Sequence, residues 1–326
     1  MSGAKVPFFA LLIFLLTALS CAPHQVPARG DPIRVGQVKN EELSLREIPL
    51  ERYIAGVLEK EVRADWPLEA LKAQAVAART YALYRKSKPR DSQFDVLSDT
   101  TDQVFESDEN HAPSIVRAVL ETEGQTLQSK GRVFEAFFHS CCGGTSESAD
   151  AVWPGNHPAP LVEVHEDPYC SACPPAHWKY RVSLKDFEKR LEQSDRPSTG
   201  WSGVVVSERD ASGRVESATL TSTSRKSLPL SGIELRKILG NTNVKSTLFD
   251  ITENGDDLVF EGRGSGHGVG MCQWGAKGMA EHGKSYREIL EFYYPGADIV
   301  SLSAEAPAAP AVSSQDKIIE DLERPK

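Results

Sequence analysis

The sequence lacks an excess of basic side chains, which narrows the classes of partner. Lys and Arg number 37 against 46 Asp and Glu, so the formal net charge at pH 7 is -9. A protein whose main partner is nucleic acid usually carries a basic excess or a basic stripe, so no nucleic-acid partner is expected. There is no internal repeat, and the 326 residues, 40% hydrophobic and 25% charged, are enough for one large or two modest soluble globular domains.

Long hydrophobic runs are also scarce: one lies near the N-terminus, and no later segment is apolar enough to cross a membrane. Residues 6–19 are almost wholly apolar and follow Lys5, which is typical of an export signal and short for a membrane span. Small residues before Cys21 favour a lipoprotein-type signal peptide over residues 1–21, with a lipid on Cys21. Ordinary cleavage after Ala22 is the alternative. Either way we expect an exported cell-envelope protein facing the periplasm or cell wall. With the lipoprotein-type signal, the lipid would be its only membrane anchor.

Cysteine is scarce, with six residues in the chain. Apart from Cys21 and the isolated Cys272, the cysteines form two short groups, at 141–142 and 170–173. A Cys-x-x-Cys pair with an upstream His and Cys can bind zinc, and the candidate ligands are His139, Cys142, Cys170 and Cys173. An exported protein can instead keep such cysteines in one or two disulfides. A zinc ion with four protein ligands would be structural, because no position remains for water.

The patterning of the chain predicts a folded region between two less regular ends. Residues 22–40 are predicted to be a polar tether, residues 41–303 a domain, and residues 304–326 a disordered tail. Apolar spacing predicts helices at 50–62, 65–85, 232–239, 275–282 and 285–293, the second along an alanine-rich stripe at 68–82, and strands at 132–139, 180–184, 203–207, 214–221 and 258–262. Turn-forming residues at 208–213 join two of these strands into a predicted hairpin at 203–221. Separate helices mixed with antiparallel hairpins indicate the α+β class.

Glu61 is the carboxyl group that the sequence singles out. It follows an apolar helix and precedes Trp66. A carboxyl beside an aromatic ring in a partly dry cleft has a raised pKa, so it can donate a proton to a glycosidic oxygen. Lys72 and Arg79 lie two helical turns apart and share a face, so both are candidates for holding a substrate. The alternative is that Glu61 is a solvated acid at a helix end and that both bases are surface charges.

A glycine-rich segment at 262–275 has six glycines in 14 residues. Its glycines permit positive φ or the close approach of backbone to a ligand. The segment is not a phosphate-binding loop, because no Gly-Lys-Ser/Thr follows. His267, Gln273 and Trp274 suit sugar recognition, since a ring can stack on a sugar and an amide can hydrogen-bond to it. The alternative is a tight structural turn in which His267 is satisfied internally.

Three stretches together resemble the SpoIID/LytB family. They are residues 50–81, with the run Trp66-Pro67-Leu68-Glu69-Ala70-Leu71-Lys72; Phe138-His139-Ser140 with Cys142-Gly143-Gly144; and Gly264-Ser265-Gly266-His267-Gly268, which continues to 276 and is followed by 293–296. Their order and spacing match along about four-fifths of the chain. One departure is Cys272, which stands where many members have Ser; a thiol is a weaker hydrogen-bond donor than a hydroxyl.

The resemblance implies a SpoIID-like catalytic domain that cleaves peptidoglycan strands between N-acetylmuramic acid and N-acetylglucosamine, in some members after removal of stem peptides. Glu61 matches the family's catalytic acid, and some members carry zinc near the His-Ser motif. A single acid suits a lytic transglycosylase, in which the muramyl 6-hydroxyl attacks its own anomeric carbon, whereas a hydrolase usually presents two carboxyls. The alternatives are a glycan-binding enhancer of a cell-wall amidase and a zinc hydrolase that uses His139 and the cysteines.

Overall fold

The computed structural model describes residues 26–302, apart from 107–109, 175–176, 223 and 225. The predicted signal peptide at 1–21, the predicted lipidation site Cys21 and the predicted tail at 304–326 lie outside the described residues. Within the described part, helices and small, mostly antiparallel sheets are interspersed along the chain, which confirms the α+β class. None of the described helices is long and apolar enough to span a bilayer.

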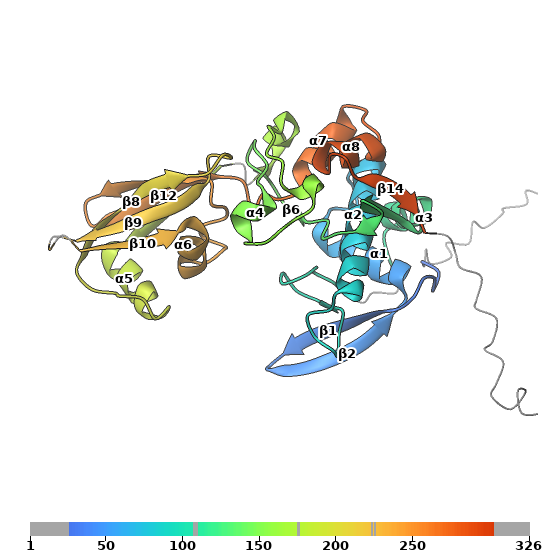
Figure 1. Cartoon of the computed structure of the whole chain (residues 1–326), viewed down its shortest axis with the longest axis horizontal. Coiled ribbons are helices and arrows are strands. Elements are labelled where there is room, and N and C mark those ends of the chain that lie inside the picture. Colours follow the sequence, from blue (N-terminus) through green and yellow to red (C-terminus); the bar gives the residue numbers. More distant parts are fainter. Residues whose placement is uncertain (1–25, 107–109, 175–176, 223, 225, 303–326) are drawn as a thin grey trace, which may run out of the picture.

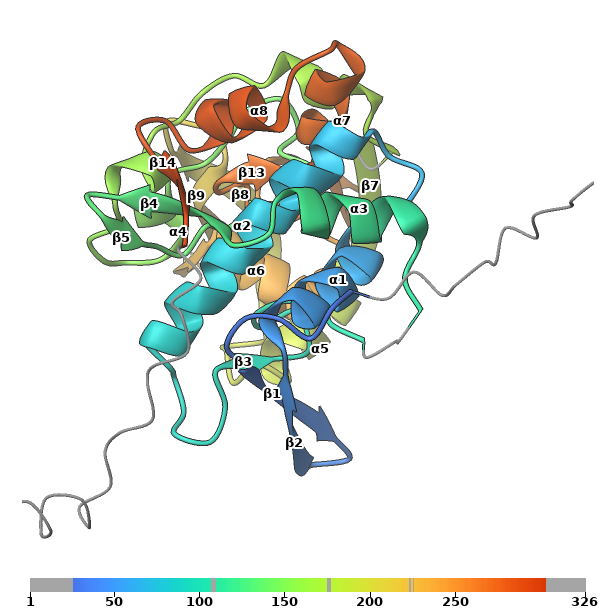
Figure 2. The ribbon, with the colours of Figure 1, turned by 90° about the vertical axis from the view of Figure 1, so that its right-hand side faces the viewer.

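Helix α2 (Leu68–Ser87) runs through the middle of the helical part of the molecule, as Figure 2 shows. It contacts α1 (Leu50–Glu61), α3 (Pro113–Glu121), α7 (Gln273–Glu281) and α8 (Tyr286–Tyr293). Four neighbours can pack so closely because the helix is rich in alanine, a small side chain that lets backbones approach. Its fully buried alanines are Ala73, Ala75, Ala77, Ala78 and Ala82.

A three-stranded sheet flanks α1. In it, β1 (Ile33–Lys39) pairs antiparallel with β2 (Glu42–Ile48) and parallel with β3 (Val96–Leu97). Ile33 and Val35 alternate with polar or small residues and are buried in the core beside α1. Residues 33–39 therefore belong to the fold, which corrects the prediction that a polar tether extends to residue 40. The strand was missed because its apolar face is only two residues long.

A second core packs on a different face of α2 and joins distant parts of the chain. Strand β4 (Gln125–Ser129) pairs with β5 (Arg132–Val133) and β14 (Asp298–Ser301), while β6 (Phe138–His139) pairs in parallel with β13 (Met271–Cys272). The predicted strand at 132–139 is thus broken, and its two ends have different partners. Short helical turns follow β6: α4 (Ala149–Val152), η1 (Ala159–Leu161) and η2 (Pro168–Ala172). The β6–β13 pair brings the His-Ser motif against the glycine-rich segment.

Residues 177–263 form a separate lobe at the left of Figure 1. It has two three-stranded antiparallel sheets, ordered β10-β9-β8 and β11-β12-β7. Its elements are β7 (His177–Ser183), α5 (Leu184–Glu192), β8 (Trp201–Arg209), β9 (Val215–Ser222), β10 (Ser227–Ser231), α6 (Gly232–Leu239), β11 (Phe249–Asn254) and β12 (Asp257–Arg263). The pairing of β8 with β9 confirms the predicted hairpin at 203–221. Phe187, Phe249 and Phe260 belong to a core confined to this lobe.

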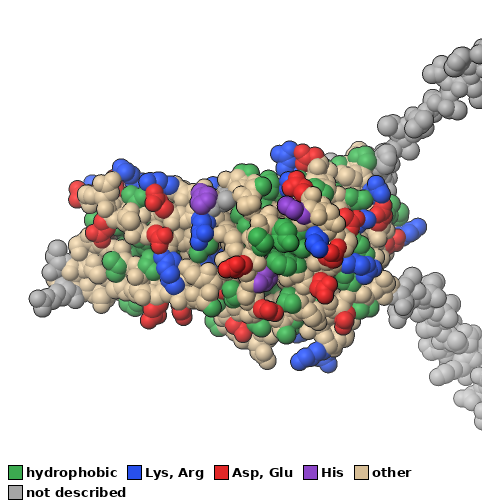
Figure 3. Space-filling view, turned by 90° about the horizontal axis from the view of Figure 1, so that it is seen from above, with side chains coloured by type: hydrophobic (Ala, Val, Ile, Leu, Met, Phe, Trp, Pro, Cys, Tyr) green, Lys and Arg blue, Asp and Glu red, His purple; other side chains and the backbone are tan. Residues whose placement is uncertain are grey.

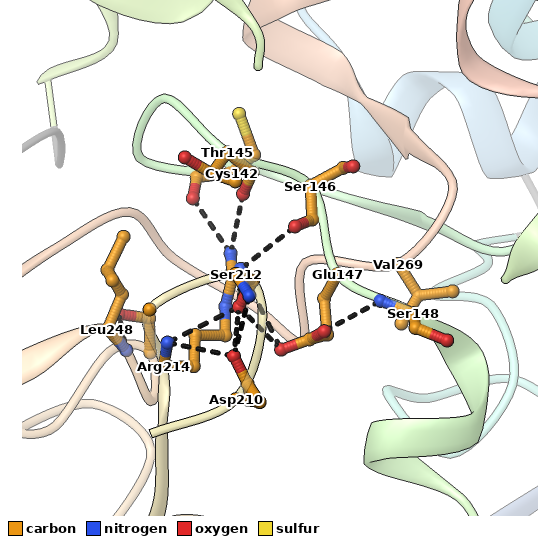
Figure 4. A network of polar contacts seen from close by, with 12 residues as sticks. Cys142, Thr145, Ser146, Glu147, Ser148, Asp210, Ser212, Arg214, Leu248 and Val269 are labelled. Atoms are coloured by element: carbon orange, nitrogen blue, oxygen red, sulfur yellow. Dashed lines mark hydrogen bonds and ion pairs between the residues drawn. The ribbon is translucent and has the colours of Figure 1, made fainter. Parts of the chain in front are cut away.

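One buried arginine connects the lobe to the rest of the molecule. Arg214, just before β9, donates hydrogen bonds to the carbonyl oxygens of Cys142 (2.8 Å), Thr145 (3.0 Å) and Ser146 (3.3 Å), as Figure 4 shows. The Arg214 side chain is 1% exposed. The guanidinium thereby fixes the loop that carries Cys142 against the turn between β8 and β9.

Charged side chains of both signs share the surface. On the face that Figure 3 shows, acidic and basic side chains are interspersed, and no continuous basic stripe crosses that face. Exposed pairs such as Lys179–Glu261 and Arg181–Asp257 join opposite charges across neighbouring strands. This mixed surface follows from the composition, in which acids only modestly outnumber bases.

Candidate active site

Glu61 lies at the C-terminal end of α1, where the backbone becomes extended at Val62. Its carboxylate accepts a hydrogen bond from the backbone N–H of Val104 (3.1 Å) and another from the side-chain amide of Gln273 (3.3 Å). Gln273 is the first residue of α7 and directly follows β13. The structure therefore brings Glu61 into contact with the end of the glycine-rich segment, 212 residues further along the chain.

The surroundings of Glu61 favour its neutral acid form. Burial raises the pKa of the Glu61 carboxyl above its ordinary value. The hydrogen bonds from Val104 and Gln273 stabilise the carboxylate and offset part of this rise in pKa. Both partners are uncharged, so neither holds the group ionised as an arginine would. Such a carboxyl keeps its proton to a higher pH than an exposed glutamate does, which a general acid needs.

Two tryptophans pack against each other where α1 ends and α7 begins. Trp66 lies in the turn between α1 and α2, and Trp274 directly follows Gln273. Their ring centroids are 5.1 Å apart in an edge-on arrangement. The Lys277 ammonium lies 5.5 Å from the centroid of the Trp274 ring. Trp274, predicted to stack on a sugar, thus has structural contacts that position Gln273, although its side chain stays partly exposed.

The glycine-rich segment is pressed against residues 137–143. Four alternate glycines, from 264 to 270, have φ between +67° and +109°. A Cβ on Gly268 would lie 2.5 Å from the Arg214 guanidinium, and one on Gly270 would meet the carbonyl oxygen of Phe137. Here the glycines permit two protein segments to approach each other. The prediction of positive φ is confirmed, and the close approach is made to the protein's own backbone.

His267 is satisfied inside this turn. Its Nδ1 accepts a hydrogen bond from the backbone N–H of Val269 (3.1 Å), and its Nε2 donates to the carbonyl oxygen of Phe138 (3.1 Å). Burial lowers the pKa of His267 to about 4, so the ring is neutral at neutral pH. The alternative interpretation, a tight structural turn in which His267 is satisfied internally, therefore holds for its nitrogens, because the backbone uses both. A ligand can reach only the ring.

A pocket of about 320 Å³ adjoins the His267 ring. Ring stacking between Phe137 and Trp153, with centroids 4.4 Å apart, forms part of its wall. Its lining combines aromatic and charged side chains: Tyr81, Arg90, Asp102, Glu135, Phe137, Phe138, Trp153, His157 and His267. Two lining residues lie close in the chain or sheet to the donors that bind Glu61. Asp102 is two residues before Val104, and Phe138 pairs with Met271, which is two residues before Gln273. The two segments that hold Glu61 therefore also build this pocket, whose mixed lining suits a polar ligand with apolar faces.

The cysteines in the described part of the chain divide into a disulfide and a cluster. Cys141 and Cys173 form the disulfide. Cys142, Cys170 and Cys272 are free and buried, and their sulfur atoms lie with a carboxylate oxygen of Asp167 in a group whose members are all within 4.8 Å of one another. Three thiols and a carboxylate are ligand types that zinc accepts.

The predicted metal ligands need correction at two positions. Cys173 is removed from the set because it forms the disulfide. His139 is removed because it lies outside the cluster, with its Nδ1 3.1 Å from the carbonyl oxygen of Val269. Asp167 and Cys272 are the other two members of the cluster that could hold a metal ion. Asp167 gave no sequence signal as one acid among 46 acidic residues, whereas Cys272 stood out as an unpaired thiol and was interpreted only as a replacement for Ser.

Comparison with known proteins reveals the relatives of this chain. Residues 39–128 match the family described as stage II sporulation protein. The chain is 37% identical to an uncharacterized protein of Brachyspira hyodysenteriae, over 78% of this chain and 68% of that protein. It is 30% identical to stage II sporulation protein D of Bacillus amyloliquefaciens, over 83% of this chain and 80% of the relative. The chain belongs to the SpoIID/LytB family.

Two further matches describe the architecture of this SpoIID/LytB chain. Residues 175–270 match a domain of unknown function, DUF8618, which coincides with the separate lobe. The chain is also 29% identical to a protein of Bacillus subtilis named amidase enhancer, over 76% of this chain and 40% of that protein. The first family segment carries Glu61, so the candidate acid and the lobe belong to different matched regions.

Lys72 and Arg79, predicted to hold substrate, have structural roles in this SpoIID/LytB member. Arg79 is fully buried and forms two hydrogen bonds with the Glu51 carboxylate, at 2.6 and 2.9 Å. The Lys72 ammonium pairs with Glu69 (2.8 Å) and Glu121 (2.6 Å). Arg79 is thus too deeply buried to reach a ligand, whereas substrate contact by the partly exposed Lys72 stays a prediction.

Proposed function

We propose that this protein is a peptidoglycan lytic transglycosylase in which Glu61 is the general acid and base. Its family membership supports a role at the cell wall. The observation that carries the finer proposal is the contact between Glu61 and Gln273, which joins this acid to the glycine-rich segment. Burial raises the pKa of the Glu61 carboxyl, which suits a proton donor at neutral pH.

The proposed reaction uses one carboxyl group twice. Glu61 first protonates the oxygen between N-acetylmuramic acid and N-acetylglucosamine, and the bond from that oxygen to the muramyl anomeric carbon breaks. The Glu61 carboxylate then accepts the proton of the muramyl 6-hydroxyl, whose oxygen attacks the same anomeric carbon. The products are a new N-acetylglucosamine 4-hydroxyl end and a 1,6-anhydromuramyl end. No water is consumed, and Glu61 recovers its proton.

We propose that the pocket lined by Phe137, Trp153 and His267 binds a sugar unit of the strand. Trp153 and Phe137 offer ring surface, and Arg90 and His157 offer polar groups at its edge. Aromatic rings pack against the apolar face of a sugar, while polar groups bind its hydroxyls and amides. These residues are better candidates than Lys72 and Arg79 for holding the glycan, because they line the pocket, whereas Arg79 is fully buried against Glu51 and Lys72 pairs with Glu69 and Glu121.

The test compares Glu61→Gln with Glu106→Gln. Glu106 is two residues from Val104, but its side chain is 64% exposed and pairs with Lys60 on the surface. Loss of a general acid reduces turnover by about 10²–10⁴-fold. We therefore expect Glu61→Gln to release anhydro-ended fragments from glycan strands at a rate reduced by this factor, measured by mass spectrometry. Glu106→Gln should act at the wild-type rate. Wild-type activity in Glu61→Gln contradicts the proposed role.

A second candidate function is suggested by the relative named amidase enhancer. In this alternative the pocket binds the glycan without cutting it, and the partner is a cell-wall amidase. Digestion of intact and peptide-stripped peptidoglycan separates the two functions. Anhydro ends produced by the protein alone support the transglycosylase. Uncut strands, together with faster release of stem peptides by an added amidase, support the enhancer.

The place of action that we propose is the cell envelope. The apolar segment at 6–19 and the small residues before Cys21 support export and a lipid anchor. A protein held in this way would face the periplasm or cell wall, where glycan strands lie. Mass spectrometry of the mature N-terminus would show either a lipid on Cys21 or a free end after Ala22.

A further inference from the structure

Four buried side chains from three separate segments converge beside the candidate active site. Cys142 follows β6, Asp167 and Cys170 belong to the η2 region, and Cys272 ends β13. Their ligand atoms all lie within 4.8 Å of one another. We propose that these four residues bind one structural zinc ion. This inference does not depend on the proposed transglycosylase activity.

The arrangement fits the size and donor chemistry of a tetrahedral zinc site. Ligands at about 2.3 Å from a tetrahedral ion are about 3.8 Å from one another. Here Cys142 Sγ lies 3.2 Å from both Cys170 Sγ and Asp167 Oδ2. Small outward shifts of these side chains would therefore admit the ion. A soft donor set of three sulfurs excludes magnesium and calcium, which require oxygen ligands.

The surroundings of the cluster stabilise deprotonated ligands. Backbone N–H groups point at the sulfurs: those of Cys142 and Gly275 donate to Cys272 Sγ, each at 3.3 Å, and that of Gly144 donates to Cys142 Sγ at 3.4 Å. Such hydrogen bonds favour thiolates, and outer contacts of this kind orient metal ligands. The site therefore already has the donors that ligating thiolates need.

The carboxylate of the cluster is also held in place. Tyr293 donates its hydroxyl to Asp167 Oδ2 (2.8 Å), and the backbone N–H of Tyr169 donates to Asp167 Oδ1 (2.9 Å). Three thiolates and one carboxylate around a divalent ion leave a net charge of about -2. The fully buried Arg214 guanidinium lies next to this charge, bonded to the carbonyl oxygen of Cys142 (2.8 Å).

Burial makes the proposed site closed. The four residues are between 0% and 2% exposed. With four protein ligands and no access for solvent, the ion cannot activate water, so its role is structural. Cys272 directly precedes Gln273, and it caps α7 by accepting a hydrogen bond from Gly275. The ion would thus fix the start of the helix that presents Gln273 to Glu61.

Metal content and thiol number test the proposal in the full chain. After reconstitution under reducing conditions with one equivalent of zinc and removal of the excess, we expect one zinc per chain. Titration of a separate sample, purified without reductant and denatured in chelator, should find three thiols besides Cys21, since Cys141 and Cys173 are paired. Cobalt in place of zinc should give an intense thiolate charge-transfer band. Less than half an equivalent of metal, or a single thiol because Cys142 and Cys170 are joined, overturns the proposal.

Matched variants identify the ligands. Cys170→Ser and Cys272→Ser should each reduce bound zinc at least tenfold, and Asp167→Asn should weaken its affinity 10- to 100-fold. The double variant Cys141→Ser, Cys173→Ser removes only the disulfide and should keep one zinc per chain. Chelator should lower the unfolding temperature of the wild type by roughly 10 °C. Zinc that survives in Cys170→Ser but is lost from the Cys141, Cys173 double variant would overturn the assignment even if another variant fails to fold.

Discussion

Each oxygen of the Glu61 carboxylate has one neutral hydrogen-bond donor. Val104 donates to Oε1 and Gln273 to Oε2. Because burial raises the pKa of Glu61, the folded state favours its protonated form. The stability that this group contributes is therefore present at low pH and is lost as the pH rises through its folded pKa. Glu61→Gln should remove that loss, so this variant should be at least as stable as the wild type at neutral pH.

Replacing Gln273 by Leu should move the pH dependence of cleavage. The amide stabilises the carboxylate, so its removal raises the pKa of Glu61 further. Because the acid must carry its proton, the alkaline fall in kcat should shift to higher pH in Gln273→Leu. Poorer positioning of the acid should also reduce kcat by about 10- to 100-fold. The measurement is kcat against pH on peptide-free glycan strands.

Lys277→Met is the matched control for this shift. Lys277 also lies on α7, but its ammonium faces Glu281 and the Trp274 ring. Its alkaline limb should coincide with that of the wild type. A Gln273→Leu profile that overlays the wild-type curve would show that the amide does not tune the acid.

The glycine-rich segment is an element whose shape depends on tight backbone contact. Gly270 has φ +67°, and a Cβ there would lie 2.1 Å from the carbonyl oxygen of Phe137. That contact lies beside the β6–β13 pairing, which leads directly into Gln273. A side chain at this position would therefore push the start of α7 away from Glu61.

Gly270→Ala and Gly283→Ala separate packing from backbone strain. Gly283 has φ +77°, and a Cβ there would have no neighbouring atom within 4 Å. Alanine at this position should therefore cost only the conformational energy of a left-handed backbone, about 1–2 kcal/mol. Gly270→Ala adds a backbone clash and should lower the free energy of unfolding by at least about 3 kcal/mol. It should also reduce cleavage at temperatures where it remains folded. Equal losses in urea unfolding of the two variants would contradict this packing role.

The sequence predicted those helices and hairpins whose pattern of apolar and turn-forming residues lies within one continuous segment. The alanine stripe at 68–82 predicted α2, and the turn-forming residues at 208–213 predicted the β8–β9 hairpin. The strand at 132–139 was wrong in its middle, because its apolar residues pair with two different partners. Strand β1 was missed because tertiary burial of two residues outweighs its polar composition.

The candidate site was also predictable only where its signal lies within one segment of the chain. Glu61 and the glycine-rich segment were each recognisable, and the structure brings them together through Gln273. The roles of Arg79 and Lys72 depended on which helix face is buried, and helical spacing alone does not say which neighbours cover it. The cysteine cluster depended on pairing between distant residues, since Asp167 and Cys272 are 105 positions apart.

The whole molecule consists of a helical body and a lobe that meet at a buried polar junction. The Arg214 side chain donates three of its four hydrogen bonds across that junction, and Ser212 donates to Glu147 Oε2 (2.8 Å) beside it (Figure 4). Three carbonyl acceptors of the 142–146 loop depend on one guanidinium. The lobe therefore stabilises the loop that carries Cys142.

Removing this guanidinium should loosen the loop as well as the lobe. Arg214→Met leaves three buried carbonyl acceptors without their donor and Glu147 without its cationic partner, and we expect a loss of about 3–5 kcal/mol in the free energy of unfolding. Limited proteolysis should also cut within 142–147 faster than in the wild type. Arg181→Met, which breaks an exposed pair with Asp257, should cost less than about 1 kcal/mol. Indistinguishable unfolding curves for the two variants would contradict the role of the junction.

Digestion of purified glycan strands in water labelled with heavy oxygen tests the central claim most directly. If Glu61 transfers protons within the strand and the muramyl 6-hydroxyl is the nucleophile, the new ends are 1,6-anhydromuramyl groups without label. Mass spectrometry of the fragments reads both features in one spectrum. New reducing ends that carry the label would show that water attacks the anomeric carbon, and strands left uncut by the active, folded protein would show that it is not a cleaving enzyme.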